Sequence, residues 1–96
     1  MKYGYIMYGN MTQEMIKLTS EQRNKKMEEY RAEAEKKGWH MVMWGHPFGV
    51  SENILVVYET PKQLSAMFED HLPNVMDNAR TDIVALPEKK DGYNAR

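Results

Sequence analysis

The stretch WHMVMWGHPFG, residues 39–49, decides the fold together with ILVVYE, residues 54–59. Aromatic and β-branched residues are frequent in both segments, and such residues favour strands over helices. The intervening residues 47–53 (PFGVSEN) contain the proline and glycine that are typical of a loop. We therefore predict two adjacent strands, at 39–46 and 54–59, that pair as an antiparallel hairpin.

The segments before this hairpin predict a strand followed by a long helix. Residues 2–9 (KYGYIMYG) are rich in tyrosine and include two glycines that would weaken a helix, so a strand is expected there. Thr19 and Gln22 have the spacing of a capping box, and Gly38 stands where a helix C-cap belongs. The helix is therefore predicted over residues 20–37.

The segments after the hairpin predict a second helix and a last strand. Thr60 offers a capping hydroxyl, and Pro61 suits the first helical position. Pro73 should end this helix, and residues 82–86 (DIVAL) should form the last strand. One face of the helix would be apolar and would carry Leu64, Met67, Phe68, His71 and Leu72.

These elements predict one α+β domain over residues 1–87 and a flexible tail over residues 88–96. Residues 10–18 are expected to form a loop between the first strand and the first helix. The resulting order, βαββαβ, is the ferredoxin-like arrangement, a four-stranded antiparallel sheet with two helices on one face.

Both faces of the predicted sheet are apolar. Simple alternation puts Trp39, Met41 and Met43 on one face of their strand and His40, Val42, Trp44 and His46 on the other. The other strands show the same mixture of apolar residues on both faces. Two helices cover only one face, so we expect a second copy to cover the other in a homodimer that packs sheet to sheet.

The chain resembles the dimeric α/β-barrel superfamily, in which two ferredoxin-like subunits pack sheet against sheet. This resemblance covers roughly residues 2–87 and rests on the order of elements and the two-faced strands. Members include small antibiotic-biosynthesis-type monooxygenases, haem-degrading monooxygenases and isomerases, and also many domains without known activity. The resemblance implies a pocket between the sheet and its own helices.

Composition excludes several classes of site. The chain has no cysteine, which removes thiolate nucleophiles, iron–sulfur ligation and CxxC zinc sites. No signal peptide or apolar membrane span is recognisable, and a cytoplasmic location is the simplest expectation. The formal net charge of −1 gives no bulk attraction to nucleic acid or to an anionic membrane, so neither is expected as a partner. No cofactor is expected.

RNA-recognition modules share this order of elements and are the competing class. Their first-strand signature places an aromatic ring at its second position, whereas residues 6–11 (IMYGNM) have Met7 there and Tyr8 one position later. An offset of one residue turns the ring to the opposite face of the sheet. RNA binding is therefore not expected.

His46 and His71 are the candidate catalytic residues, as general acids or bases. His46 follows Trp44 on the same face of the predicted strand, and His71 lies on the apolar face of the second helix. His40 and His46 are separated by about 20 Å along a straight strand, so they cannot share a metal ion. No metal site is predicted. The structural alternatives are a turn-capping role for His46 and a packing role for His71.

The candidate ligand-binding residues are polar or aromatic groups that could line a pocket. Methionine and aromatic rings would select a flat, apolar or aromatic molecule, and tyrosine hydroxyls would orient it. These residues are Asn10, Trp44, Tyr5, Tyr8, Tyr58, Met67 and Phe68. In haem-degrading members an asparagine, a tryptophan and a histidine surround the cofactor. The resemblance would assign Asn10, Trp44 and His71 to those roles, although the family tryptophan comes from the third strand.

The sequence thus predicts a small homodimeric domain that binds a small apolar or aromatic molecule between sheet and helices. Cofactor-independent monooxygenation or isomerisation is the enzymatic alternative. A non-catalytic assembly module is the other alternative, and in that case tryptophan and methionine should fill the space between sheet and helices.

Overall fold

The computed structural model describes residues 2–73 and 75–87, and the predicted tail at 88–96 lies outside them. None of the helices in this part of the chain has the length and apolar character needed to cross a membrane. The elements follow the order β1 (Lys2–Met11), α1 (Gln13–Lys17), α2 (Ser20–Lys36), β2 (His40–Gly45), β3 (Ile54–Thr60), α3 (Ser65–Asp70) and β4 (Met76–Leu86).

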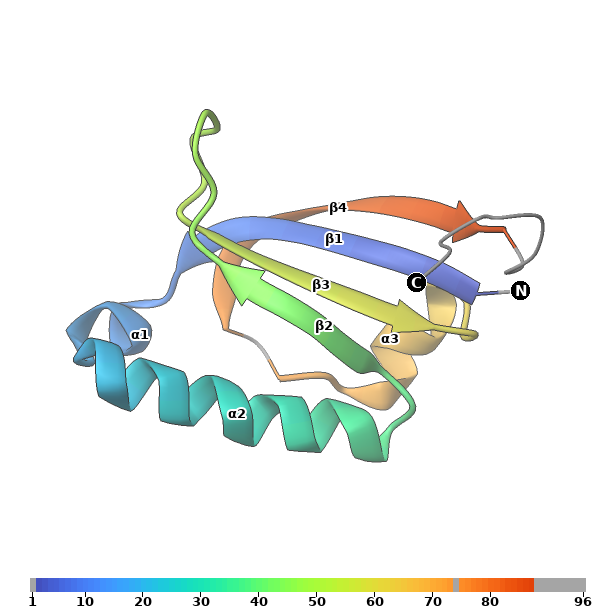
Figure 1. Cartoon of the computed structure of the whole chain (residues 1–96), viewed down its shortest axis with the longest axis horizontal. Coiled ribbons are helices and arrows are strands. Elements are labelled where there is room, and N and C mark those ends of the chain that lie inside the picture. The colour runs from blue at the N-terminus through green and yellow to red at the C-terminus, as the bar shows by residue number, and fades with distance from the viewer. Residues whose placement is uncertain (1, 74, 88–96) are drawn as a thin grey trace.

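The strands form one four-stranded sheet in the order β2-β3-β1-β4, and every neighbouring pair is antiparallel. Helix α2 runs alongside β2, and α3 lies behind the sheet near the C-terminal end of β3 (Figure 1). The loop between β2 and β3 projects beyond the sheet (Figure 1). The predicted α+β class and antiparallel sheet are confirmed, with three helices among the described residues instead of two.

Helix α2 begins and ends as the sequence predicts. The Thr19 hydroxyl accepts a hydrogen bond from the Gln22 amide at 3.1 Å, and the Gln22 side chain accepts one from the Thr19 amide at 3.0 Å. At the other end Gly38 has a φ of +87°, a conformation that glycine adopts at little cost. The amide of Trp39 then donates to the Ala34 carbonyl at 2.9 Å, which closes the last turn.

The short helix α1 was not predicted, because five residues are too few to show a helical period. The Thr12 hydroxyl caps it by accepting from the Met15 amide at 3.3 Å. The Arg23 guanidinium on α2 donates to the Met15 carbonyl at 3.1 and 3.2 Å and to the Leu18 carbonyl at 3.2 Å. Arg23 therefore fastens the end of α1 to the first turns of α2.

The second helix is shorter than predicted. Thr60 ends β3, and its hydroxyl donates to the Gly38 carbonyl at 2.8 Å, so Thr60 is not a helix cap. Helix α3 starts at Ser65 and its N-cap position, Leu64, makes no side-chain capping bond. The Thr60 hydroxyl also accepts from the Lys62 amide at 3.1 Å, but this local turn does not continue into a helix, which begins only at Ser65.

Strand β4 is longer than predicted and begins at Met76, because Met76, Asp77, Arg80 and Thr81 also pair with β1. Its register shifts between Tyr8 and Asn10 of β1, and Asn78 has a φ of +54° opposite this irregularity. Asparagine tolerates this conformation better than most residues, so the polar segment bends without leaving the sheet.

A bulge in β2 reverses the predicted alternation of side chains. Met41 pairs with Tyr58, but Met43 pairs with Val57, so one extra residue is inserted between them. Trp44 is consequently opposite the buried Val56 and packs against the core, whereas Met43 is 48% exposed on the other face. The prediction that Met43 lies on the same face as Trp39 and Met41 was therefore wrong.

Aromatic and methionine side chains fill the space between the sheet and α2. The Trp39 ring is fully buried, with the Tyr5 ring centroid at 5.2 Å and the Tyr58 centroid at 6.0 Å. Helix α2 contributes Met27 and Ala34 to the same cluster. The buried members of this core are Tyr5, Met15, Met27, Ala34, Trp39, Met41, Ile54, Val56, Tyr58, Val75 and Met76.

Asp70 supplies the hydrogen-bond acceptor that the buried indole of Trp39 requires. The Asp70 carboxylate accepts from Trp39 Nε1 and, at 2.9 Å, from Lys62 Nζ. These two hydrogen bonds lower the pKa of Asp70 below its ordinary value of 3.8. The carboxylate therefore joins the end of α3 to the start of β2 and to the segment after β3.

Replacing Asp70 should destabilise the protein through the orphaned indole N–H. A buried donor without an acceptor costs free energy, so we expect Asp70→Ala to lower the Tm by about 5 °C or more at neutral pH. Thermal unfolding followed by circular dichroism measures this change. Glu69→Ala, which alters an exposed neighbour on the same helix, is the matched control and should leave the Tm within about 2 °C.

The contribution of Asp70 should also depend on pH. Because folding lowers its pKa, the stabilisation is present above the unfolded pKa and is lost as the pH falls through the folded pKa. The Tm difference between the wild type and Asp70→Asn should therefore shrink as the pH falls below 3.8. A difference that stays constant from neutral pH down to that range would contradict the ionised Asp70 bridge.

Candidate functional site

The predicted ligand-binding residues Tyr5 and Tyr58 lie in the core. Tyr5 is fully buried, and its hydroxyl donates to the Lys62 carbonyl at 2.8 Å. Burial, followed by the nearby Tyr3, raises the pKa of Tyr5, and burial raises the pKa of Tyr58 to about 12. Both phenols are therefore neutral at physiological pH and serve packing.

Trp44 and His46 are brought together, as predicted, at the end of β2. Their ring centroids are 5.7 Å apart and the rings are nearly perpendicular, at 85°. His46 Nδ1 lies 2.9 Å from the carbonyl oxygen of Asn53. Because a carbonyl only accepts hydrogen bonds, Nδ1 carries the hydrogen and the neutral ring keeps Nε2 as an acceptor. This geometry fits the turn-capping role that the sequence left open for His46.

Asn53 holds the base of the β2–β3 loop against β1, a role that was not predicted from the sequence. Its amide donates to the Gly9 carbonyl at 3.1 Å, and its side-chain oxygen accepts from the Met11 amide at 2.7 Å. Together with the His46 contact, these bonds tie both ends of the β2–β3 loop to the end of β1. Only its place in a turn-rich stretch, PFGVSEN, could have indicated this role.

Helix α3, which His71 follows, and the end of β2, which His46 follows, lie at opposite ends of the sheet (Figure 1), so the two candidate catalytic histidines do not share a site. His71 follows α3 with a φ of +50°, is exposed, and accepts Lys37 Nζ on its carbonyl oxygen at 2.8 Å. Its neighbours form an open depression of about 370 Å³, which is lined by Glu29, Tyr30, Glu33, Lys37, His71 and Pro73.

The remaining predicted residues are dispersed. Asn10 pairs with Asp77 between β1 and β4 and is partly exposed. On α3, Met67 packs against the core, whereas Phe68 is 76% exposed. The structure therefore does not bring these side chains to Trp44 or His71 as one pocket.

A larger depression lies at the opposite end of α2 from His71. Its volume is about 630 Å³, which is within the range of small-molecule sites. Apolar side chains of Met15 and Leu18 share its walls with charged Lys26. Its lining is Thr12, Gln13, Glu14, Met15, Leu18, Lys26, Tyr30 and Asp77, so Tyr30 borders both depressions. We call this depression the α1–α2 groove.

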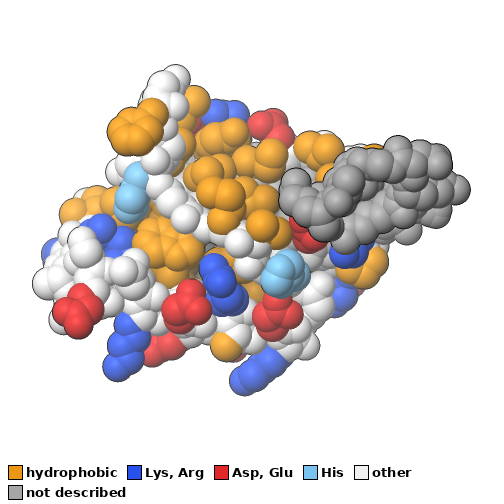
Figure 2. All heavy atoms as spheres, in the orientation of Figure 1, with side chains coloured by type: hydrophobic (Ala, Val, Ile, Leu, Met, Phe, Trp, Pro, Cys, Tyr) orange, Lys and Arg blue, Asp and Glu red, His pale blue; other side chains and the backbone are white. Residues whose placement is uncertain are grey.

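The sheet face away from the core is a second candidate site, which we call the open face. Directly paired residues share a side of a sheet, and Ile6, Val57 and Met43 are paired across β1, β3 and β2 on the side opposite Tyr5 and Tyr58. The apolar residues of the open face include Ile6, Tyr8, Met43, Leu55, Val57, Val84 and Leu86, all partly or largely exposed. Figure 2 shows hydrophobic side chains gathered over the central part of the sheet.

Charged residues border the open face at the β4 side. Arg80 donates to Glu52 at 2.6 Å and lies 4.1 Å from the ring centroid of Tyr8. This hydrogen bond lowers the pKa of Glu52 and raises the pKa of Arg80, so both stay ionised. At another border Lys2 lies 3.9 Å from Glu59. The open face therefore has an apolar centre and a rim that carries both signs of charge.

No group of three or more potential metal ligands gathers anywhere in residues 2–73 and 75–87. The chain matches no family model, and no curated protein sequence matches it either.

The tautomer of His46 gives a direct check of this geometry. In its neutral form we expect His46 to be the Nδ1–H tautomer, because only that tautomer donates to the Asn53 carbonyl. Imidazole nitrogen chemical shifts measured by NMR distinguish the two tautomers. The exposed His71, whose ring has no such carbonyl partner in the described structure, provides the internal comparison. A predominant Nε2–H form at His46 would contradict the assignment.

Proposed function

We propose that the protein is an assembly domain that forms a homodimer by packing its open face against that of a second copy. The observation that carries this proposal is the apolar open face, in which Met43 is 48% and Val84 is 44% exposed. Soluble monomers rarely leave an extended apolar patch uncovered, and such patches usually mark interfaces. A homodimer covers the open face of both subunits without a second kind of protein.

The arrangement of elements supports the same proposal. We take the strand order β2-β3-β1-β4 as the ferredoxin-like order, with α1 and α2 forming one crossover and α3 the other. Two such sheets facing each other would produce the dimeric α/β-barrel arrangement. Helix α1 is then part of the first crossover and leaves the strand order unchanged.

The rim of the open face is suited to a partner identical to itself. A two-fold axis brings each surface patch against its own copy, so an interface of this kind needs both signs of charge on its rim. Arg80, Glu52 and Asp82 provide both signs on one side, and Lys2 and Glu59 do so elsewhere. An apolar centre with a polar rim is also the usual anatomy of a protein interface.

The filled space behind the sheet favours assembly over a ligand pocket between the sheet and α2. Trp39 and Met27 are both fully buried there, and Met41 is 1% exposed. A bound molecule at this position would have to displace these side chains from a close-packed core. This is the packing expected of the assembly alternative.

Binding of a small apolar or aromatic molecule is the second candidate function, and the α1–α2 groove favours it. The groove combines the apolar Met15 and Leu18 with the ring of Tyr30 and the ammonium group of Lys26. Lys26 Nζ lies 6.0 Å from the Tyr30 ring centroid. A flat ring could stack on Tyr30 while a polar substituent reaches Lys26. An enzymatic role in monooxygenation or isomerisation would need further groups, because His46 and His71 lie apart.

A charge placed in the centre of the open face should prevent dimer formation. Ile6 lies on the central strand β1 and faces Val57 on β3. We expect Ile6→Lys to raise the dimer Kd on the order of 100-fold or more, because burying an ammonium group in an apolar interface costs free energy even beside Asp82, which pairs with Ile6 across β1 and β4. Sedimentation equilibrium measures this constant directly.

The matched control is Ile16→Lys, which makes the same change at a 46% exposed position on α1, away from the open face. Its dimer Kd should stay within about twofold of the wild type. If the wild-type protein is a monomer at high micromolar concentration, or if both variants weaken the dimer equally, the proposed interface is wrong.

The α1–α2 groove can be tested with indole as a probe. An NMR titration should shift the resonances of Leu18 and Tyr30 first, because these residues line the groove. We expect Tyr30→Ala to weaken indole binding about tenfold, the effect of losing one aromatic contact. Tyr8→Ala, on the open face, is the matched control and should leave indole binding unchanged. Shifts confined to other residues would exclude this groove as the site.

A further inference from the structure

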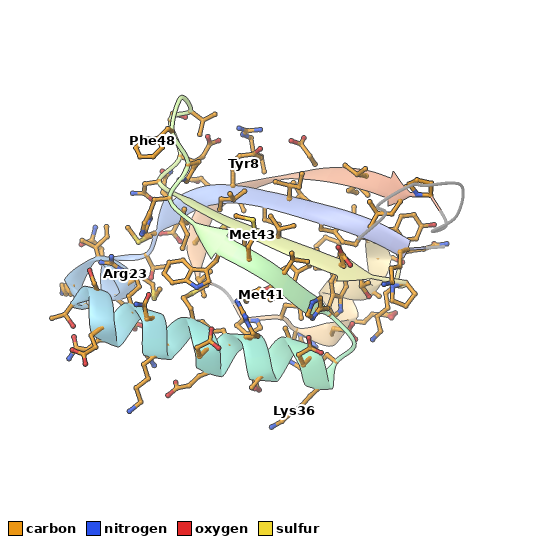
Figure 3. All side chains as sticks on the ribbon, in the orientation of Figure 1. Tyr8, Arg23, Lys36, Met41, Met43 and Phe48 are labelled. Atoms are coloured by element: carbon orange, nitrogen blue, oxygen red, sulfur yellow. The ribbon has the colours of Figure 1, made fainter. Side chains whose placement is uncertain are left out.

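The loop that joins β2 to β3, residues 46–53, presents a large apolar side chain to solvent. Phe48 is 97% exposed, and Val50 in the same loop is 41% exposed. Figure 3 shows Phe48 on the part of the loop that projects beyond the sheet. We call residues 46–53 the arm. A phenylalanine held this far from its own core has no packing role in the isolated subunit.

The base of the arm is fixed, although its tip is exposed. His46 and Asn53 are joined at 2.9 Å across the base, and Asn53 is bonded to the Gly9 carbonyl and the Met11 amide of β1. Glu52 is bonded to Arg80 on β4 at 2.6 Å. The arm is therefore anchored to two other strands, which reduces the conformational entropy lost when its tip binds a partner.

The chemistry of the arm indicates an apolar protein surface as its partner. Residues 47–51 (PFGVS) carry no charge, and the arm contains neither lysine nor arginine. Its single carboxylate, Glu52, is already paired with Arg80. Loops that insert into anionic membranes or bind nucleic acid combine apolar residues with basic ones. The arm lacks that basic component.

The apolar surface of the arm continues that of the open face. Met43 on β2 and Leu55 on β3 belong to the open face, and these two strands lead directly into and out of the arm. The arm extends beyond its own sheet (Figure 1), so it leaves its own open face uncovered. A second copy that meets the open face would also come within reach of the arm.

We propose that the arm of each subunit docks on the second copy in the homodimer, with Phe48 as its apolar anchor. This inference rests on the proposed sheet-to-sheet dimer and extends it. The two-fold axis supplies two such contacts for each dimer. Phe48 would then act as an energetic hot spot at the edge of the interface, and the rigid base would hold it in position.

Phe48→Ala and Phe68→Ala provide a matched test. Both residues are exposed phenylalanines, but Phe68 lies on α3 and not on the arm or the open face. We expect Phe48→Ala to raise the dimer Kd on the order of tenfold or more in sedimentation equilibrium. Phe68→Ala should leave it within about twofold. Circular dichroism should show the same secondary structure and Tm for both variants, because neither side chain is in the core.

A photo-crosslinking amino acid at position 48 tests the contact directly. We expect irradiation of the full-length protein to produce a covalent dimer, and mass spectrometry should place the link on the second copy. The same residue at position 68 should give only monomer. If Ile6→Lys dissociates the dimer but Phe48→Ala does not, and position 48 yields no covalent dimer, the arm proposal is wrong while the sheet interface stands. A monomeric wild type would instead overturn the dimer itself.

Discussion

The buried indole of Trp39 is the constraint on which the rest of the structure depends. Its ring lies between Tyr5 and Tyr58 beneath the sheet, and its N–H must find an acceptor inside the protein. Asp70 provides it from the end of α3. This hydrogen bond holds the end of α3 against the residue that precedes β2. The ion pair between Asp70 and Lys62 reinforces the same contact.

The same core explains why the functional features lie elsewhere. Tryptophan, tyrosine and methionine fill the side of the sheet that faces α2, so the groups able to contact another molecule are displaced to the open face, the arm and the α1–α2 groove. The open face and the arm have the features of an interface between proteins, an apolar centre with a charged rim. The α1–α2 groove is lined by both polar and apolar side chains and is open to solvent.

The sequence predicted the parts of the fold that local signals specify. The capping box at Thr19 and the glycine at position 38 located α2 almost to the residue, and β-branched residues located β3. The start of β4, residues 76–81, was missed because most of these residues are polar and their side chains show no strand pattern, although this part of the strand is joined to β1 through the backbone. Of the candidate site, the pairing of Trp44 with His46 was foreseeable, whereas Asn53 and Asp70 depend on contacts distant in sequence.

The bulge in β2 determines which side chains of that strand face the core. Met41 and Trp44 face the core although they are three residues apart, which an unbroken strand with a period of two would forbid. Pairing this extra residue as a regular strand position would exchange the faces of everything that follows, and would turn the indole of Trp44 toward solvent and Met43 toward the core. Deleting the extra residue would instead leave plain alternation, with Met43 and Trp44 on the faces that they have now. Relatives of this protein should therefore accept the loss of position 42 far better than the gain of a residue there.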